Sequence, residues 1–137
     1  MNESILLQVG TKILLKNENG RYLLLRRSPI RYPRIMNCWD IPGGRIIPGT
    51  PLVENIKREV FEETKLSVSS EPKLIGAQDI IRLPEKHIVR LTFSAETSGE
   101  PVLNDEHIEF KWMTLEEMKN EKMLDEFTRK ILENDFI

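Results

Sequence analysis

The stretch "GRIIPGTPLVENIKREVFEETKL", residues 44–66, contains the features that decide the fold. Apolar residues recur in it at helical spacing, at Leu52, Val53, Ile56 and Val60. This spacing predicts an amphipathic helix of about four turns that begins near residue 52. We expect Thr50 to cap the helix and Pro51 to take its first position. The preceding "DIPGGRIIPGTP", residues 40–51, is dense in Gly and Pro and predicts an irregular loop.

Three glutamates crowd the second half of this predicted helix, at Glu59, Glu62 and Glu63. At about 100° per residue, Glu59 and Glu63 lie roughly 40° apart and Glu62 roughly 60° from Glu59. Three carboxylates at this spacing suit a hard divalent cation such as Mg²⁺, which binds oxygen ligands and is commonly shared with substrate phosphates. Arg58 is four residues before Glu62 and four after Glu54, so it is expected to pair with either of them. An exposed acidic helix is the alternative, because like charges cost only about 0.2–0.5 kcal/mol there.

Glycines directly upstream of the helix add to the case for a binding site. Gly43 and Gly44 have no side chains, so a ligand can approach their backbone closely. A glycine loop that leads into a helix is a known way to bind phosphate, although such a loop alone is a weak signal. The loop and the glutamates together favour a site for a metal ion and a phosphate group.

The rest of the chain predicts an α+β fold. Runs of branched aliphatic residues predict strands at residues 5–17, 21–28, 73–83, 87–97 and 109–114. Residues 29–39 contain two prolines and predict a loop, and residues 115–135 predict one short and one longer helix. Paired strands with one helix between the pairs and more helices at the end indicate a mixed sheet covered by helices.

Composition limits the cellular setting and the partners. A chain of 137 residues predicts a single domain over residues 1–137. The net charge is -2, with both signs interspersed, which disfavours nucleic acid polymers and membrane surfaces as partners. The single cysteine, Cys38, excludes an internal disulfide, and no run of about 18 apolar residues occurs. We therefore interpret the protein as soluble and cytoplasmic.

Residues 44–66 resemble the Nudix box: Gly, five residues, Glu, seven residues, Arg-Glu, an aliphatic, any residue, Glu-Glu, any residue, Gly, an aliphatic. The chain matches this pattern at Gly44, Arg58, Glu59, Val60, Glu62, Glu63 and Leu66. Thr50 and Lys65 differ from it, since they stand where the pattern has Glu and Gly. If position 65 requires a positive φ, a lysine there costs on the order of 1 kcal/mol. The resemblance extends to "WDIPGG" (39–44) and to residues 104–118.

The resemblance implies a Nudix-like α/β/α sandwich with a mixed β-sheet and a loop-helix-loop catalytic motif. It also implies hydrolysis of a nucleoside diphosphate linked to another group X, with Mg²⁺ or Mn²⁺ as cofactor. The principal metal ligands implied are Glu59 and Glu63, assisted by Glu62 and the carbonyl of Gly44. Glu106 matches a family glutamate six residues before a tryptophan, and either Glu62 or Glu106 is the implied general base. Arg58 is the third residue assigned to catalysis.

Substrate contacts are expected from both sides of the glycine loop. Gly43 and Gly44 would offer backbone, and either Arg26 or Arg27 would hold a phosphate, with a solvated strand end as the favoured alternative for both arginines. Because side chains alternate along a strand, only one of these arginines is expected to face the cleft. Trp39 is a candidate to stack on a base, with a position in the core as the alternative.

The second tryptophan and the two histidines are not expected in the functional site. Trp112 is expected in the core. His87 and His107 lack the spacing of a metal-binding pair and are expected at the surface.

The sequence is compatible with more than one substrate class. The short chain favours nucleoside triphosphates, including damaged ones, over ADP-ribose or nucleotide sugars. A second hypothesis is a non-catalytic Nudix-fold module that binds a nucleotide or a partner. Thr50 and Lys65 keep this hypothesis open, whereas the intact "REVFEE" (58–63) argues against it. Nudix domains of this size occur as monomers and as homodimers, so the resemblance does not choose between them.

Overall fold

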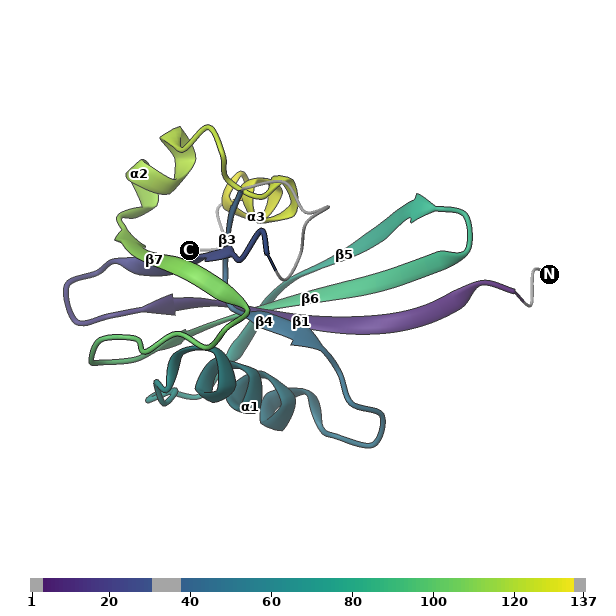
Figure 1. Cartoon of the computed structure of the whole chain (residues 1–137), viewed down its shortest axis with the longest axis horizontal. Coiled ribbons are helices and arrows are strands. Elements are labelled where there is room, and N and C mark those ends of the chain that lie inside the picture. Colours follow the sequence, from purple (N-terminus) through teal and green to yellow (C-terminus); the bar gives the residue numbers. More distant parts are fainter. Residues whose placement is uncertain (1–3, 31–37, 135–137) are drawn as a thin grey trace.

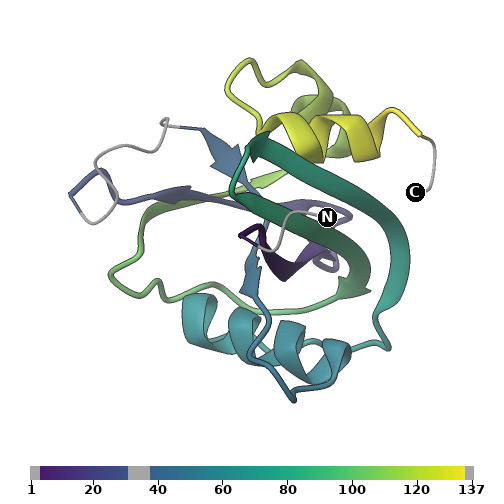
Figure 2. The ribbon, with the colours of Figure 1, turned by 90° about the vertical axis from the view of Figure 1, so that its right-hand side faces the viewer.

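The computed structural model describes residues 4–30 and 38–134, and residues 1–3, 31–37 and 135–137 fall outside this description. The described residues form a mixed sheet with α1 on one face and α2 and α3 on the other (Figure 1). A view turned by 90° shows the same three layers (Figure 2). The strands are β1 (Leu6–Lys16), β2 (Tyr22–Arg27), β3 (Trp39–Asp40), β4 (Gly43–Arg45), β5 (Lys73–Leu83), β6 (Lys86–Glu96) and β7 (His107–Met113). The helices are α1 (Leu52–Thr64), α2 (Leu115–Asn120) and α3 (Glu126–Leu132).

The sheet combines parallel and antiparallel pairs. The strand order is β3-β2-β1-β6-β5, and β4 and β7 pair with β1 and β2 respectively. β1 and β6 run parallel along their whole lengths, from Leu6↔Lys86 to Lys16↔Glu96. β5 and β6 form an antiparallel hairpin. The mixed sheet and the α/β/α layers were predicted correctly.

Two hydrophobic clusters hold the layers together. Ile13 and Leu15 of β1 pack toward α1 in one cluster, and Leu14 between them belongs to the cluster on the opposite side. This alternation follows from the period of two along a strand. All three side chains are fully buried, so this part of β1 is covered on both faces, and residues 13–15 form a short continuous apolar run.

The residues that cap the two ends of α1 are a proline and a lysine. Pro51 lies at the N-cap with φ -59° and ψ 148°, and no side chain caps the helix. The predicted cap by Thr50 and the predicted helical Pro51 are therefore wrong, because the backbone of Pro51 is still extended. Lys65 ends the helix with φ 63° in the left-handed conformation, and its N–H donates to the Phe61 carbonyl at 2.9 Å. Position 65 does require a positive φ, at the cost expected of a lysine.

Other boundaries also differ from the prediction. Residues 40–51 are not wholly irregular, because β4 pairs with Gly10–Lys12 of β1. The two predicted terminal helices are present, although α3, with seven residues, is only one residue longer than α2. Most of the predicted loop at 29–39 lies outside the described residues, and Trp39 begins β3. No helix among the described residues has the length and apolar character needed to cross a membrane.

Candidate active site

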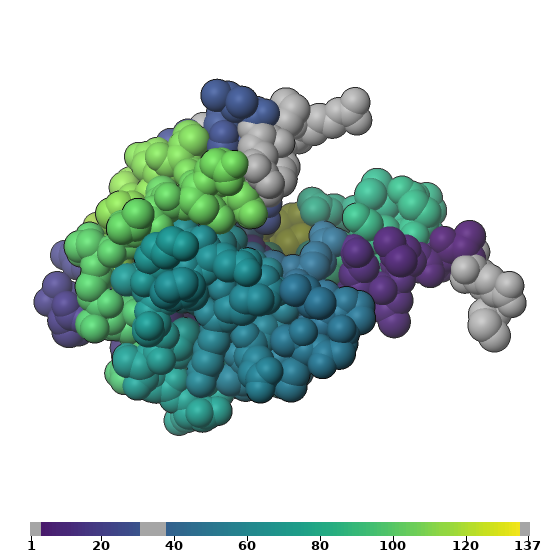
Figure 3. All heavy atoms as spheres, turned by 60° about the horizontal axis from the view of Figure 1, so that its bottom comes forward, coloured from purple at the N-terminus to yellow at the C-terminus, as the bar shows by residue number. Residues whose placement is uncertain are grey.

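A cleft of about 830 Å³ opens where α1, β4 and the segment before β7 meet the start of α3. Figure 3 shows this hollow, with yellow atoms near the C-terminus visible in its depth. Four glutamates line one side of the cleft, which we call the acidic wall: Glu59, Glu62, Glu63 and Glu106. The structure thus brings together all of the glutamates predicted to bind metal or to act as base. A smaller hollow of about 620 Å³ beside α2 contains none of them.

The three glutamates of α1 differ in burial. Glu62 is exposed, Glu59 is half-buried, and Glu63 is only 3% exposed. Burial raises the pKa of Glu63 to about 7, and the neighbouring carboxylates of Glu59 and Glu106 act in the same direction. Burial also raises the pKa of Glu59. Lys12 and the Gly43 N–H lower the pKa of Glu63 and Arg58 lowers that of Glu59, but these contributions do not outweigh burial.

Arg58 connects the exposed and half-buried members of the acidic wall. Its guanidinium donates to Glu62 at 2.9 Å and to Glu59 at 3.0 Å. The predicted pairing of Arg58 with Glu62 is confirmed. The same guanidinium donates to Asn55 at 2.7 Å, so the arginine is held from both sides.

Gly43 and Gly44 lie where a side chain has no room. Gly43 has φ 136°, and a Cβ there would come within 2.0 Å of the Thr11 carbonyl oxygen. A Cβ on Gly44 would come within 2.8 Å of the Glu59 carboxylate. The Gly43 N–H donates to Glu63 Oε1 at 2.9 Å, which fixes that carboxylate. The bare backbone therefore lies directly against the acidic wall, and the Gly44 carbonyl accepts from Thr11 Oγ1 at 3.5 Å.

Asn55 is a structural residue of the site that the sequence analysis missed. It is fully buried, and its amide donates to Thr11 Oγ1 at 2.9 Å. Its oxygen accepts from Arg58 at 2.7 Å and from the Ile47 N–H at 3.3 Å. Asn55 thus ties α1 to β1 and to the loop before the helix. The signal in the sequence was weak, since Asn55 directly precedes the buried Ile56 but Leu52, one turn earlier, is exposed.

His107 corrects a second expectation. It was predicted at the surface but is 8% exposed, and its Nε2 lies 3.8 Å from Glu63 Oε2. Burial lowers the pKa of the ring to about 4. Glu63, Glu106 and His107 form a cluster able to hold a metal ion. The prediction failed because β7 begins at His107 and turns its side chain inward. His87 is partly exposed and pairs with Asp79 at 2.7 Å.

The predicted substrate residues divide between the cleft and the core. Arg27 lines the cleft. Arg26 instead pairs with Glu109 at 2.8 Å and lies 5.4 Å from the centroid of the Trp39 ring. Trp39 is 6% exposed and belongs to a core cluster, which matches the alternative to base stacking. Trp112 packs partly buried against the other cluster, as expected.

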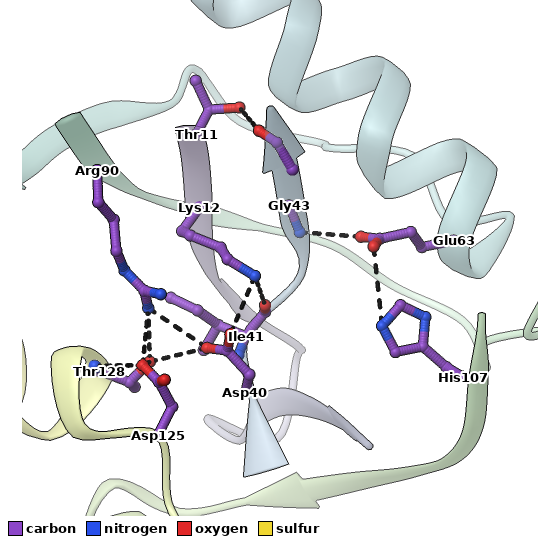
Figure 4. A network of polar contacts seen from close by, with 11 residues as sticks. Thr11, Lys12, Asp40, Ile41, Gly43, Glu63, Arg90, His107, Asp125 and Thr128 are labelled. Atoms are coloured by element: carbon purple, nitrogen blue, oxygen red, sulfur yellow. Dashed lines mark hydrogen bonds and ion pairs between the residues drawn. The ribbon is translucent and has the colours of Figure 1, made fainter. Parts of the chain in front are cut away.

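The opposite side of the cleft, which we call the paired wall, consists of Lys12, Asp40, Arg90 and Asp125 (Figure 4). Asp40 lies 3.1 Å from the Lys12 ammonium and 3.3 Å from the Arg90 guanidinium. Arg90 also reaches Asp125 at 3.2 Å. Burial opposes ionisation of Asp40, but Lys12 and Arg90 outweigh it and hold its pKa well below the usual range. These carboxylates have their counter-charges within the protein.

The three-layer fold and the acidic wall beside a glycine loop define an α+β domain with a cluster of carboxylates next to bare backbone. A family model described as the NUDIX domain matches residues 6–135. The chain therefore belongs to the Nudix hydrolase family, as its resemblance to the Nudix box implied.

Individual relatives agree with this assignment. The chain is 29% identical over 106 residues to a Bacillus subtilis protein named "Putative 8-oxo-dGTP diphosphatase", covering 77% of this chain and 65% of that protein. It is 31% identical over 123 residues to the Arabidopsis thaliana protein "Nudix hydrolase 19, chloroplastic", covering 85% of this chain and 26% of that protein. The chain thus spans less than two thirds of the length of either relative.

Solved structures extend the agreement to the fold. The crystal structure of a MutT protein from Methanosarcina mazei Go1 superposes with a TM-score of 0.83 at 32% identity. The match covers 97% of this chain and 94% of that chain. The predicted Nudix fold is confirmed.

Proposed function

We propose that the protein hydrolyses a nucleoside diphosphate linked to another group X, with Mg²⁺ or Mn²⁺ as cofactor. The observation that carries this proposal is the acidic wall, where four carboxylates meet beside Gly44 and the pKa values of the two more buried helix glutamates are raised. The oxygen donors fit a hard divalent cation. Membership of the Nudix hydrolase family supports the same reaction.

Glu59 and Glu63 would hold the ion, assisted by Glu62 and the carbonyl of Gly44. When bound, a divalent cation neutralises charge on the pyrophosphate oxygens, which is the main requirement in phosphoryl transfer. Arg58 keeps the glutamates of α1 in place through its hydrogen bonds to Glu59 and Glu62.

The remaining residues of the cleft bind the substrate and accept a proton from the attacking water. Arg27 lines the cleft and would hold a phosphate of the substrate. A water molecule attacks phosphorus and gives its proton to Glu62 or Glu106, both of which line the cleft. The phosphoanhydride bond breaks, and a nucleoside monophosphate leaves together with the phosphorylated group X.

Within this class we propose nucleoside triphosphates, including damaged ones, as substrates. The Bacillus subtilis relative named "Putative 8-oxo-dGTP diphosphatase" supports this choice over ADP-ribose and nucleotide sugars. Such substrates fit a cytoplasmic location, which is part of the same proposal. A monomer and a homodimer both stay compatible with it.

One assay tests this function. The protein is incubated with intact and oxidised nucleoside triphosphates, nucleotide sugars, dinucleoside polyphosphates and ADP-ribose, each with Mg²⁺, with Mn²⁺ and with a chelator. We expect release of nucleoside monophosphate that requires the metal and is fastest with triphosphates. Faster cleavage of ADP-ribose or a nucleotide sugar would overturn the substrate choice. Saturable nucleotide binding without turnover at saturating metal would overturn the enzyme and support a binding module.

A further inference from the structure

The backbone around His107 is fixed at the edge of the acidic wall. His107 pairs with Arg27 of β2 as the first residue of β7. The N–H of Ser28 donates to the Glu106 carbonyl at 2.8 Å, and the N–H of Glu106 donates to the Asn104 side chain at 3.1 Å. These contacts hold the segment on both sides of the Glu106–His107 peptide, so both side chains start from defined positions beside the cleft.

The His107 ring is buried without the hydrogen bonds that a buried imidazole usually makes. Its side chain is 5% exposed, and Nδ1 has no hydrogen-bond partner within the described part of the chain. Nε2 points toward Glu63 Oε2 at 3.8 Å, which is too long for a hydrogen bond (Figure 4). Buried polar atoms in native proteins are normally satisfied, yet the described residues give Nδ1 no partner and give Nε2 only the distant Glu63 carboxylate.

The spacing around the ring suits an ion rather than a direct hydrogen bond. Glu63, Glu106 and His107 each offer one ligand atom, and the three atoms lie within 4.8 Å of one another. Ligands about 2.1 Å from an ion lie about 3 Å apart when adjacent and about 4.2 Å apart when opposite. The 3.8 Å between Nε2 and Oε2 falls in this range. Glu63 Oε1 is engaged by the Gly43 N–H, which leaves Oε2 to face the ring.

We propose that His107 is a direct nitrogen ligand of the divalent ion and that it shifts the preference of the site from Mg²⁺ toward Mn²⁺. The inference rests on the proposed function, because it uses the same metal site. Mg²⁺ is bound almost entirely by oxygen, whereas imidazole nitrogen suits transition metals. At pH 7.5 an ordinary imidazole is largely neutral and has one nitrogen lone pair to give. His107 thereby sets which metal the enzyme uses.

Pulsed electron paramagnetic resonance of the full chain loaded with Mn²⁺ alone tests this directly. The chain contains only two histidines, so labelling histidine with ¹⁵N marks only His87 and His107. We expect the wild-type spectrum to contain the ¹⁴N coupling of a bound imidazole, replaced by ¹⁵N coupling in the labelled protein. His107→Gln should abolish the coupling. The matched control His87→Gln should keep it, because His87 pairs with Asp79 outside the cleft lining.

Competition between Mn²⁺ and Mg²⁺ gives the second readout. We expect His107→Gln to lower the preference for Mn²⁺ about tenfold, while His87→Gln leaves it unchanged. Saturable Mn²⁺ binding without histidine coupling in the labelled wild type would overturn the inference, even if His107→Gln fails to fold. Hydrolysis without histidine coupling would refute only this inference. Histidine coupling without hydrolysis of any substrate would refute only the proposed enzyme.

Discussion

The two sides of the cleft use the same chemical group in opposite ways. On the paired wall, Asp40 has Lys12 and Arg90 within 3.3 Å, and its pKa lies well below the usual range. On the acidic wall, burial raises the pKa of Glu63 to about 7, with Glu59 and Glu106 adding to the shift. The charges of the paired wall are therefore balanced within the protein, whereas the acidic wall would gain stability from the cation that we propose it binds.

This difference separates structure from function within one cleft. A buried charge that has its partner within the protein is part of the folded structure, and removal of the partner strongly lowers the free energy of unfolding. A cluster of carboxylates without sufficient partners is instead costly to fold and is a candidate functional site. Substitutions on the two walls should accordingly affect different measurements.

The largest expected effect is on turnover. Glu63→Gln removes a negative oxygen ligand but keeps the shape of the side chain and its contact with the Gly43 N–H. Since loss of groups that merely support metal ligands costs about 10–100-fold, we expect loss of the ligand itself to reduce turnover at least about 100-fold. Steady-state kinetics at saturating Mg²⁺ measures this. Glu54→Gln, an exposed glutamate on the same helix, is the matched control and should retain full turnover.

Full activity of Glu63→Gln would remove the functional distinction between the two walls. Circular dichroism and a thermal melt must show that both glutamine variants are folded.

The second effect concerns the stability of the paired wall. Arg90→Met leaves Asp40 and Asp125 without a shared cation, so we expect a loss of about 3 kcal/mol in the free energy of unfolding. Urea denaturation at pH 7 measures it. Arg82→Met is the control, because its pair with Glu126 is exposed and should contribute less than about 1 kcal/mol. Equal effects of the two variants would contradict a structural role for the paired wall.

The third effect is on how stability depends on pH in the metal-free protein. The pKa of Glu63 is raised from 4.5 to about 7, so its contribution is full below pH 4.5 and is lost as the pH rises to 7. The pKa of His107 is lowered from 6.5 to about 4, so its contribution is full above pH 6.5 and is lost as the pH falls to 4. In the wild-type protein the two changes oppose each other between pH 4.5 and 6.5.

Single variants separate these opposing changes. Relative to wild type, Glu63→Gln should become more stable as the pH rises from 4.5 to 7. His107→Gln should become relatively more stable as the pH falls from 6.5 to 4. Each relative change is expected to be about 3 kcal/mol. Urea denaturation across this pH range with a chelator present measures both. Curves for both variants that run parallel to wild type would refute the account of these two groups.

The smallest effect is at the end of the helix that carries the acidic wall. Lys65 has φ 63°, so Lys65→Gly should raise the free energy of unfolding by about 0.5–1 kcal/mol. A thermal melt measures the gain. A lower melting temperature would indicate that contacts of the lysine, such as its ammonium 5.1 Å from the Phe61 ring centroid, outweigh the backbone strain.

Local patterns predicted the parts of the site that depend on one segment. The helical period placed Val60 in the core, and the spacing of Glu59, Glu62 and Glu63 placed all three in the cleft. Helix geometry also predicted the pairing of Arg58 with Glu62. These features follow from the rotation of the helix per residue, which needs no knowledge of distant strands.

Features that depend on strand register were not predictable in this way. The contact between His107 and Glu63 requires the pairing of β7 with β2, and the ion pair of Arg90 with Asp40 requires the parallel pairing of β6 with β1. A shift of one residue would turn either side chain to the opposite face. Alternating apolar patterns predict that strands exist, but they do not define which strands pair or in which register.

Titration of the metal-free protein with Mn²⁺ tests the central distinction between the walls most directly. Wild type should bind Mn²⁺ saturably, and the double variant Glu59→Gln, Glu63→Gln should lose this binding. Asp125→Asn removes a charge from the paired wall, keeps a residue that can cap α3, and should bind Mn²⁺ within about twofold of wild type, since it changes no proposed ligand. Equal Mn²⁺ affinity in wild type and the double variant, or no binding by wild type, would contradict the assignment of the acidic wall as the metal site.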